Sequence, residues 1–225
     1  MKARNGWKGW LMAACLLGAA PAGALTLGFT ETFDADASGW LDATSGPLTW
    51  VASGGPDGSS YVESTFASIN DPGTIQFRGG VGASGGAFTG DWIGGGVSFL
   101  SVDVIHDAPV PVSFFFRITT GANFPAFAGI VVVPVAPNTW TNLGLAISAA
   151  NPLLVPEGPF AFGDIFSAVT NVQIGVAVPL AQEGIPFTYG IDNVQIVPEP
   201  GTAGLLGLGL LGLATQRRTR TRGRR

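Results

Sequence analysis

The chain has 225 residues, of which 46% are hydrophobic and only 12% are charged, with 34 glycines and 16 prolines. Residues 25–197 keep two of the eleven basic residues, Arg78 and Arg117, and fourteen of the fifteen acidic ones, so that two minus fourteen gives this segment a formal charge of −12. This charge excludes nucleic acid as a partner, because phosphate binding needs clustered lysine and arginine, whereas calcium, neutral sugars and cationic surfaces remain compatible.

The first 24 residues have the three parts of a secretory signal peptide. Three basic residues lie within the first eight positions, an apolar run covers residues 10–20, and small residues before position 25 predict cleavage between Ala24 and Leu25. A lipoprotein signal at Cys15 is the alternative, but the apolar stretch before this cysteine is short and the run continues beyond it. Because Cys15 is the only cysteine, a protein exported through the Sec machinery would depend on its core for stability and not on disulfides.

Residues 25–196 show the two-residue alternation of β-strands. The clearest alternations cover residues 99–104, 112–119 and 172–178. Shorter candidate strands cover residues 29–33, 48–52, 61–66, 75–78, 128–133, 140–147 and 188–196. Turns rich in Gly, Pro, Asn and Asp separate these strands, and only residues 163–169 are predicted to be helical. This pattern predicts a single all-β domain, an antiparallel β-sandwich.

Three short motifs give this domain a resemblance to a known architecture. Glu31-Thr32-Phe33-Asp34 with Gly39-Trp40 opens the domain, Trp140-Thr141 lies in its middle, and Ile191-Asp192-Asn193-Val194 closes it. Together they resemble jelly-roll domains of the carbohydrate-binding-module kind over nearly the whole of residues 25–197, which we call the body. The resemblance implies an antiparallel jelly-roll β-sandwich whose first and last strands lie together and share a structural calcium ion. The positions that match its ligands are Glu31 and Asp192.

An acidic loop supports calcium from the residues themselves. The run from Asp34 to Gly39 reads Asp-Ala-Asp-Ala-Ser-Gly, which is the opening of a calcium loop. An EF-hand is excluded because its twelfth position, which needs glutamate, is Ser45. Asp34 is therefore a third candidate ligand, and a simple turn built from Asp, Ser and Gly is the alternative.

A sugar-binding face needs an aromatic platform beside hydrogen-bonding groups. Phe115 and Arg117 fall on the side of their strand opposite the predicted core, and Asp103 does so on the preceding strand. Arg117 is expected to pair with Asp103 across the ladder, with a ligand contact as the alternative. Among the tryptophans, Trp92 lies in a glycine-rich stretch and is the one expected to be exposed. The candidate ligand-binding residues are therefore Trp92, Phe115, Arg117 and Asp103.

Motifs for catalysis are missing from the sequence. His106 is the only histidine and is expected to be a solvated turn residue, and no Gly-x-Ser-x-Gly elbow is present. No cluster of His and Cys is suited to zinc, and no glycine-rich run is followed by the Lys-Ser or Lys-Thr of a phosphate-binding loop. The glutamates lack a nearby acidic partner for glycoside hydrolysis. We therefore predict that the protein is not an enzyme.

Residues 197–225 have a separate character. Pro198-Glu199-Pro200 is followed by an apolar Leu/Gly-rich run over residues 203–215 and then by an arginine cluster. This order resembles the PEP-CTERM sorting domain, which implies processing by an exosortase. As a helix the apolar run would cover about 20 Å, less than the roughly 30 Å of a hydrocarbon core. We therefore predict transient inner-membrane anchoring with the arginines in the cytoplasm, and a permanent C-terminal anchor is the alternative.

The sequence thus predicts a signal peptide (residues 1–24), a β-sandwich domain (25–196) and a sorting signal that forms a short hydrophobic helix (197–225). Such a protein would be exported to the cell surface or the extracellular matrix. The family context implies a link with exopolysaccharide and biofilm, and the leading hypothesis is a non-catalytic structural or adhesive component of that matrix. The alternative is a glycan-binding module with a defined sugar ligand, and a polysaccharide hydrolase is less favoured.

Overall fold

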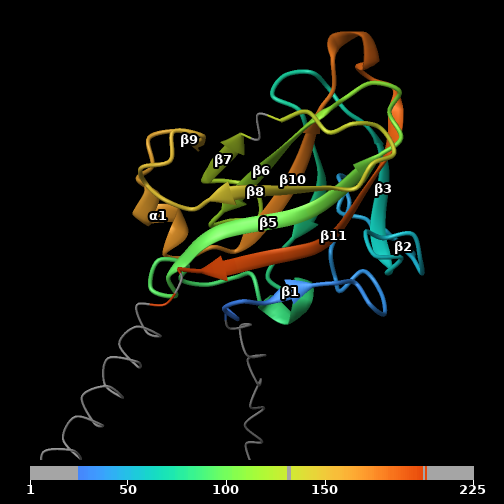
Figure 1. Ribbon diagram of the computed structural model, residues 1–225. Coiled ribbons are helices and arrows are strands. Elements are labelled where there is room, and N and C mark those ends of the chain that lie inside the picture. Colours follow the sequence, from blue (N-terminus) through green and yellow to red (C-terminus); the bar gives the residue numbers. More distant parts are fainter. Residues whose placement is uncertain (1–24, 131–132, 200, 202–225) are drawn as a thin grey trace, which may run out of the picture.

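The computed structural model describes residues 25–130, 133–199 and 201, which form two antiparallel β-sheets packed face to face (Figure 1). The first sheet consists, in spatial order, of β2 (Thr49–Val51), β3 (Tyr61–Ala67), β11 (Pro186–Pro198), β5 (Val97–His106) and β8 (Thr141–Ala146), with β1 (Thr30–Glu31) paired to β11. The second sheet consists of β4 (Thr74–Gly79), β10 (Asn171–Ala177), β6 (Ser113–Thr119), β7 (Ala126–Ile130) and β9 (Leu154–Glu157). The helices are α1 (Phe162–Phe166) and two 3-10 turns, Ala83–Gly86 and Leu180–Gln182.

The strand order is that of a jelly roll. When the short strands β1, β2 and β9 are set aside, the remaining strands run first-eighth-third-sixth in the first sheet and second-seventh-fourth-fifth in the second. This is the double Greek key of a jelly roll, so the predicted fold class is confirmed. The predicted signal peptide and C-terminal helix lie outside the described residues. No helix in the described part of the chain is long and apolar enough to cross a membrane.

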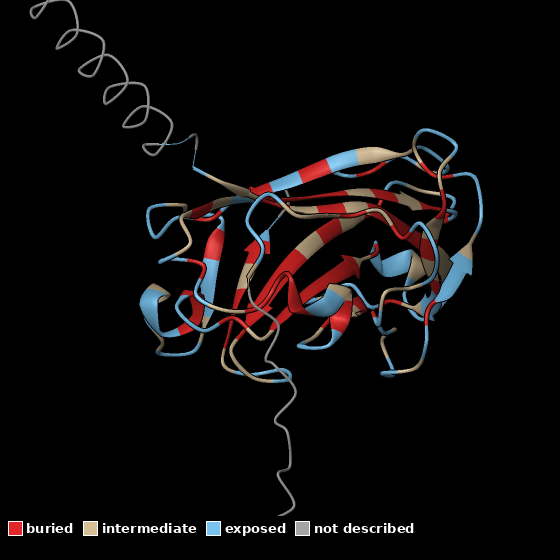
Figure 2. Cartoon of the chain, turned by 90° about the horizontal axis from the view of Figure 1, so that it is seen from below, coloured by how far each residue is buried: buried red, intermediate tan, exposed pale blue. Residues whose placement is uncertain are grey.

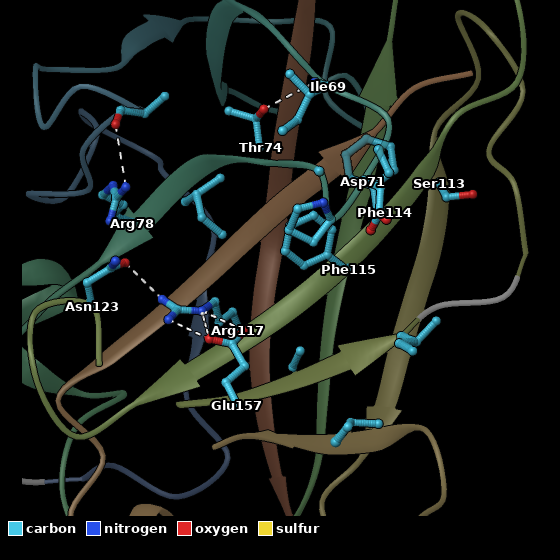
Figure 3. Close-up of a pocket in the computed structure, with 18 of the residues that line it drawn as sticks. Ile69, Asp71, Thr74, Arg78, Ser113, Phe114, Phe115, Arg117, Asn123 and Glu157 are labelled. Atoms are coloured by element: carbon cyan, nitrogen blue, oxygen red, sulfur yellow. Dashed lines mark hydrogen bonds and ion pairs between the residues drawn. The ribbon is translucent and has the colours of Figure 1, made fainter. Parts of the chain in front are cut away.

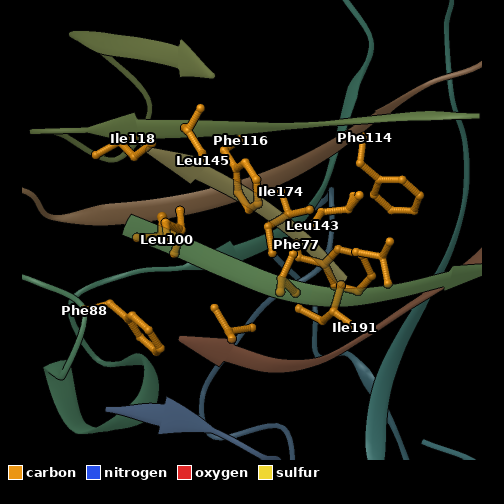
Figure 4. Close-up of a cluster of buried hydrophobic side chains, with 14 of the residues drawn as sticks. Phe77, Phe88, Leu100, Phe114, Phe116, Ile118, Leu143, Leu145, Ile174 and Ile191 are labelled. Carbon is orange, nitrogen blue, oxygen red and sulfur yellow. The ribbon is translucent and has the colours of Figure 1, made fainter. Parts of the chain in front are cut away.

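Apolar side chains from the two sheets meet in one core (Figure 4), and Figure 2 shows by colour which segments of the chain are buried. The first sheet contributes Leu100, Leu143, Leu145 and Ile191, and the second contributes Phe77, Phe114, Phe116, Ile118 and Ile174. Each buried side chain of this size contributes roughly 1.5–3 kcal/mol through the hydrophobic effect. The alternation read from the sequence therefore assigns the inner face of β5 and β6 correctly, and with it the outer face.

The predicted strands all overlap observed strands, but β9 was not predicted. This strand has four residues and includes Pro156, which cannot donate a backbone hydrogen bond. Proline is tolerated there because β9 is the outermost strand of the second sheet and pairs only with β7. The helix predicted over residues 163–169 is observed as the shorter α1.

The two ends of the described chain leave the sandwich beside one loop, residues 90–96. At the N-terminal end, a side chain added at Gly95 would lie 2.6 Å from Cδ2 of Leu25. At the C-terminal end, Pro198 is in register with Val97, and the Glu199 N–H donates to the carbonyl of Gly96 at 2.8 Å. The β-sandwich therefore extends into the first residues of the Pro-Glu-Pro motif.

Candidate functional site

A cleft with a volume of about 1050 Å³ lies on the outer face of the second sheet (Figure 3). Phe114, Phe116 and Ile118 of β6 point into the core, so the intervening residues of this strand point outward. Two of these, Phe115 and Arg117, line the cleft together with residues of β4, β7 and β9 and of the loop before β4. The cleft thus has a floor of β-strands, and Ala43 and Asn123 from two further loops also line it.

Strand register gathers polar side chains on this floor. Arg78 of β4 lies opposite Gln173 of β10, and Gln173 lies opposite Arg117 of β6. Directly paired residues in antiparallel strands share one face of the sheet. Three side chains that are distant in the sequence therefore form one row across the outer face of the second sheet, and the buried Gln173 separates the two arginines that line the cleft.

All three guanidinium nitrogens of Arg117 have hydrogen-bond partners. Its Nε donates to Oε1 and Oε2 of Glu157 at 2.8 and 2.9 Å, and its Nη2 donates to Oε2 at 2.7 Å. Its Nη1 donates to Oδ1 of Asn123 at 2.8 Å and to Oε1 of Gln173 at 2.9 Å. The contact between Arg117 and Glu157 is the only ion pair found among the described residues. Arg117 consequently fixes β9 and the Asn123 loop against the centre of the sheet.

Arg78 is far less satisfied. Its Nη2 donates to the carbonyl of Ala43 at 3.5 Å, and its buried Nε has no hydrogen-bond partner. Burial lowers the pKa of Arg78, the positive charge of Arg117 lowers it further, and Asp42 opposes both effects. Oδ1 of Asp42 is itself occupied by donors from Thr44 and Gly46 at 2.7–2.8 Å. The cleft therefore contains a guanidinium group that no carboxylate neutralises at close range.

The ring of Phe115 lies over glycine. Gly175 of β10 is directly opposite Phe115, and a side chain added at Gly175 would overlap the ring. A side chain added at Gly73 would lie 2.6 Å from the same ring. Because both neighbours lack a side chain, the half-buried ring of Phe115 can settle across the strands and form part of the cleft floor.

The predicted pair between Arg117 and Asp103 is wrong. β5 and β6 follow each other in the sequence, but they belong to different sheets, so the two residues lie on opposite outer faces of the sandwich. Asp103 instead accepts hydrogen bonds from Nδ2 of Asn142 and Nδ2 of Asn193, both at 2.8 Å. The connection between β5 and β6 crosses from one sheet to the other, whereas the sequence prediction assumed neighbouring strands.

Two further expectations about exposure are wrong. Trp92 is only 1% exposed, and its Nε1 donates to the carbonyl of Phe88 at 2.9 Å. His106 is 2% exposed, with Nε2 at 3.0 Å from the carbonyl of Val135. Burial lowers the pKa of His106, and the Val135 carbonyl and the charge of Asp107 oppose this shift. Trp92 lies in the loop before β5 and is buried there, whereas His106 is the last residue of β5 and follows Val102 and Val104 on the inner face of that strand.

Of the four predicted ligand-binding residues, Phe115 and Arg117 line the cleft, and Trp92 and Asp103 do not. Sequence analysis missed Arg78, Asn123 and Glu157, which also line it. One signal could have pointed to Arg78, because it is the only basic residue of residues 25–197 besides Arg117.

The three candidate calcium ligands lie around the β1–β11 pair, where Glu31 is in register with Val194. Asp192 is fully buried, and its carboxylate accepts from Oγ of Ser59 at 2.8 Å and from the Asn193 N–H at 2.7 Å. Burial raises the pKa of Asp192, and the charges of Asp103 and Asp34 raise it further. The hydrogen bonds from Ser59 and Asn193 lower this pKa but do not cancel the rise.

The donor set around Asp192 does not form a preformed calcium cage. Oε1 of Glu31 accepts from the Phe33 N–H at 3.0 Å, so protein donors already use oxygens of two candidate ligands. Within the described ranges, no three or more His, Cys, Asp or Glu side chains are grouped to hold a metal ion, and calcium takes about six to eight oxygens. Calcium binding stays a prediction.

Comparison with known proteins gives one sequence match and several structural ones. Residues 197–218 match the PEP-CTERM protein-sorting motif. A search of curated proteins found no match. Among solved structures, the CBM22-1-GH10 modules of the endo-1,4-β-D-xylanase 10B of Clostridium thermocellum, complexed with xylohexaose, are 16% identical with a TM-score of 0.51. An exo-β-agarase is 11% identical with a TM-score of 0.52.

These two matches cover 80% and 78% of this chain but only 30% and 26% of the matched chains. The C-terminal family 22 carbohydrate-binding module of the same xylanase matches at 12% identity and a TM-score of 0.47, over 81% of this chain and 98% of the module. At such identities the likeness shows the fold alone. The chain therefore has a jelly-roll body with the fold of carbohydrate-binding modules and carries a PEP-CTERM protein-sorting motif, which indicates an exported, cell-surface protein.

Proposed function

We propose that this protein is an exported, non-catalytic glycan-binding protein that holds a polysaccharide in the cleft of the second sheet. The observation that carries the proposal is the composition of that cleft. The ring of Phe115 lies on its floor beside polar groups of Arg78, Asn123 and Glu157. A sugar ring has an apolar C–H face and an edge of hydroxyl groups, so it can pack on an aromatic ring while its hydroxyls hydrogen-bond to such side chains.

The structural likeness supports this proposal. The matched xylanase modules include a carbohydrate-binding module and were solved with xylohexaose. Glycan binding would also supply the physical means for the predicted role in the exopolysaccharide matrix of a biofilm. A protein delivered to the cell surface by its sorting motif and attached there to a polysaccharide would act as a structural or adhesive component.

Hydrolysis of the glycan is less well supported. A glycosidase needs two available carboxyl groups flanking the scissile bond. The cleft is lined by two acidic residues, Asp71 and Glu157, and both carboxylate oxygens of Glu157 are occupied by Arg117. We therefore infer that the cleft binds its ligand without cleaving it.

The test compares Phe115→Ala with Phe99→Ala by isothermal titration of the full chain, in a non-ionic detergent, with a panel of polysaccharides. Phe99 is the matched control, because its ring also lies over a glycine, Gly144, but on the outer face of the first sheet. We expect Phe115→Ala to weaken binding about tenfold or more and Phe99→Ala to leave it unchanged. Equal binding by the wild type and Phe115→Ala, or no binding by the wild type, would contradict the proposal.

A further inference from the structure

The charge of the cleft differs from that of the rest of the body. Residues 25–197 contain only two basic side chains, Arg78 and Arg117, and both line this one cleft. The acidic residues that line it are Asp71 and Glu157. The lining is therefore formally neutral on a segment whose formal charge is two minus fourteen, or −12. A cleft for neutral sugars would not require that both cations of the body meet in it.

The two arginines have different roles. Arg117 donates to Glu157, Asn123 and Gln173, and it is 8% exposed, so it is a structural part of the floor. Arg78 is half-buried, has one long hydrogen bond and leaves its Nε unpartnered. Buried polar groups nearly always have partners, and an unpaired charge becomes more costly when water is removed from it. A ligand that covers Arg78 without a counter-charge would impose this cost.

We propose that the cleft selects acidic glycans, and that Arg78 pairs with a carboxylate group of the sugar. This inference rests on the proposed function, since it names the class of ligand for the same cleft. A guanidinium is planar and presents paired N–H donors that match the two oxygens of a carboxylate. The ring of Phe115 then holds the sugar that carries the carboxylate, and Arg117 keeps β9 and the rim in place.

The acidic surface of the body does not prevent this pairing. At physiological ionic strength the field of an exposed charge is screened over about 8 Å, so distant carboxylates act weakly on a ligand inside the cleft. The contact with Arg78 is short-range and partly shielded from water, where an ion pair is stronger. The general negative charge would instead discourage acidic polymers from binding elsewhere on the surface.

The experiment uses pairs of polymers that differ only in charge. Polygalacturonate, alginate and glucuronoxylan are each compared with their carboxyl-reduced forms, in which every carboxylate is a primary alcohol. Affinities for the full chain are measured by isothermal titration in non-ionic detergent at fixed salt. We expect at least one acidic polymer to bind about tenfold or more tightly than its reduced form. Arg78→Gln should weaken that binding about 10- to 100-fold, the value of one charged hydrogen bond, and should weaken binding of the reduced form by a clearly smaller factor, because only the acidic form brings a carboxylate to position 78.

Controls separate failure of this inference from failure of the proposed function. Arg78→Lys keeps the charge but loses the fork, so we expect an intermediate affinity, and melting curves verify that both variants fold. Equal binding of acidic and reduced polymers, or an unchanged preference in Arg78→Gln, would overturn the inference but keep the glycan-binding function. No binding of any polymer would overturn both. Polyglutamate that binds as tightly as the best acidic polymer would show that the cleft recognises acidic peptides and would contradict the glycan assignment.

Discussion

Buried polar atoms without partners are concentrated at a few residues. Among the described residues they include Nε of Arg78, Oδ1 of Asn171 and Nδ1 of His106. Arg78 and Asn171 belong to β4 and β10, the two strands at one side of the cleft floor, and Nδ2 of Asn171 donates to the carbonyl of Ala122 at 2.9 Å. Native proteins leave few such atoms unsatisfied. Of these three residues, only Arg78 lines the cleft.

His106 is a different case, because its environment is apolar and lies between the sheets. Its ring is 6.3 Å from that of Phe114, and the charged group near it is Asp107. Burial holds the pKa of His106 below its ordinary value of 6.5. The folded protein therefore keeps the neutral ring at pH values where the unfolded chain already binds a proton, and protonation favours unfolding.

This sign gives a pH prediction. The contribution of His106 to stability should be complete above pH 6.5 and should be lost as the pH falls below 6.5 toward its folded pKa. His106 is the only histidine, so His106→Gln should flatten the dependence of the unfolding free energy on pH between about 7.5 and 5.5. Urea unfolding at several pH values measures this dependence. Equal slopes for the wild type and the variant would contradict the assignment.

At the scale of elements, local patterns predict strands and faces but not strand neighbours. The alternation around Phe115 and Arg117 identifies both as outward-facing, and the structure confirms this orientation. The same pattern contains no signal that β6 lies beside β10 and β7 and not beside β5, because pairing depends on contacts distant in the sequence. Glu157 was missed for this reason, since its partner Arg117 is two strands away across the sheet.

Glycines opposite aromatic rings form a repeated feature of the sheets. Besides Phe115 over Gly175, Phe99 lies over Gly144, and the ring of Tyr61 would be 3.0 Å from a side chain added at Gly190. A ring that covers a glycine of the neighbouring strand shields backbone that would otherwise be exposed. In the cleft, the missing side chain at Gly175 also determines how closely the ring of Phe115 lies against the backbone of β10.

Gly175→Ala tests this arrangement in β10, which lies between β4 and β6. The added methyl group would overlap the ring of Phe115, so we expect a loss of about 1–3 kcal/mol in the free energy of unfolding and weaker glycan binding. Gly163→Ala is the control, because Gly163 lies in α1 with open space around it and alanine there should stabilise by up to about 1 kcal/mol. A Gly175→Ala variant as stable as the wild type would show that the ring moves aside at little cost.

At the scale of the whole molecule, the body and the sorting motif are joined without a spacer. β11 runs through the centre of the first sheet to Pro198, and the Glu199 N–H is bonded to Gly96. Leu25 lies beside the same loop. Both termini of the body therefore leave from one edge of the sandwich (Figure 1), whereas the cleft lies on the outer face of the second sheet. A body held at its C-terminal end, where the sorting motif lies, would keep the cleft available to a polysaccharide.

The sorting motif at this junction leads to a prediction about processing. We expect the wild type isolated from its producing cells to lack residues 1–24 and the segment after the Pro-Glu-Pro motif, and the variant with alanine at positions 198–200 to retain its tail. Intact-mass measurement distinguishes the two forms. The sandwich should persist in this variant, because the pairing of position 198 with Val97 uses backbone atoms, and a melting curve verifies this. Thr219→Ala, which changes the tail outside the motif, should be processed normally. A triple-alanine variant processed as completely as the wild type would show that the cell recognises features other than these three residues.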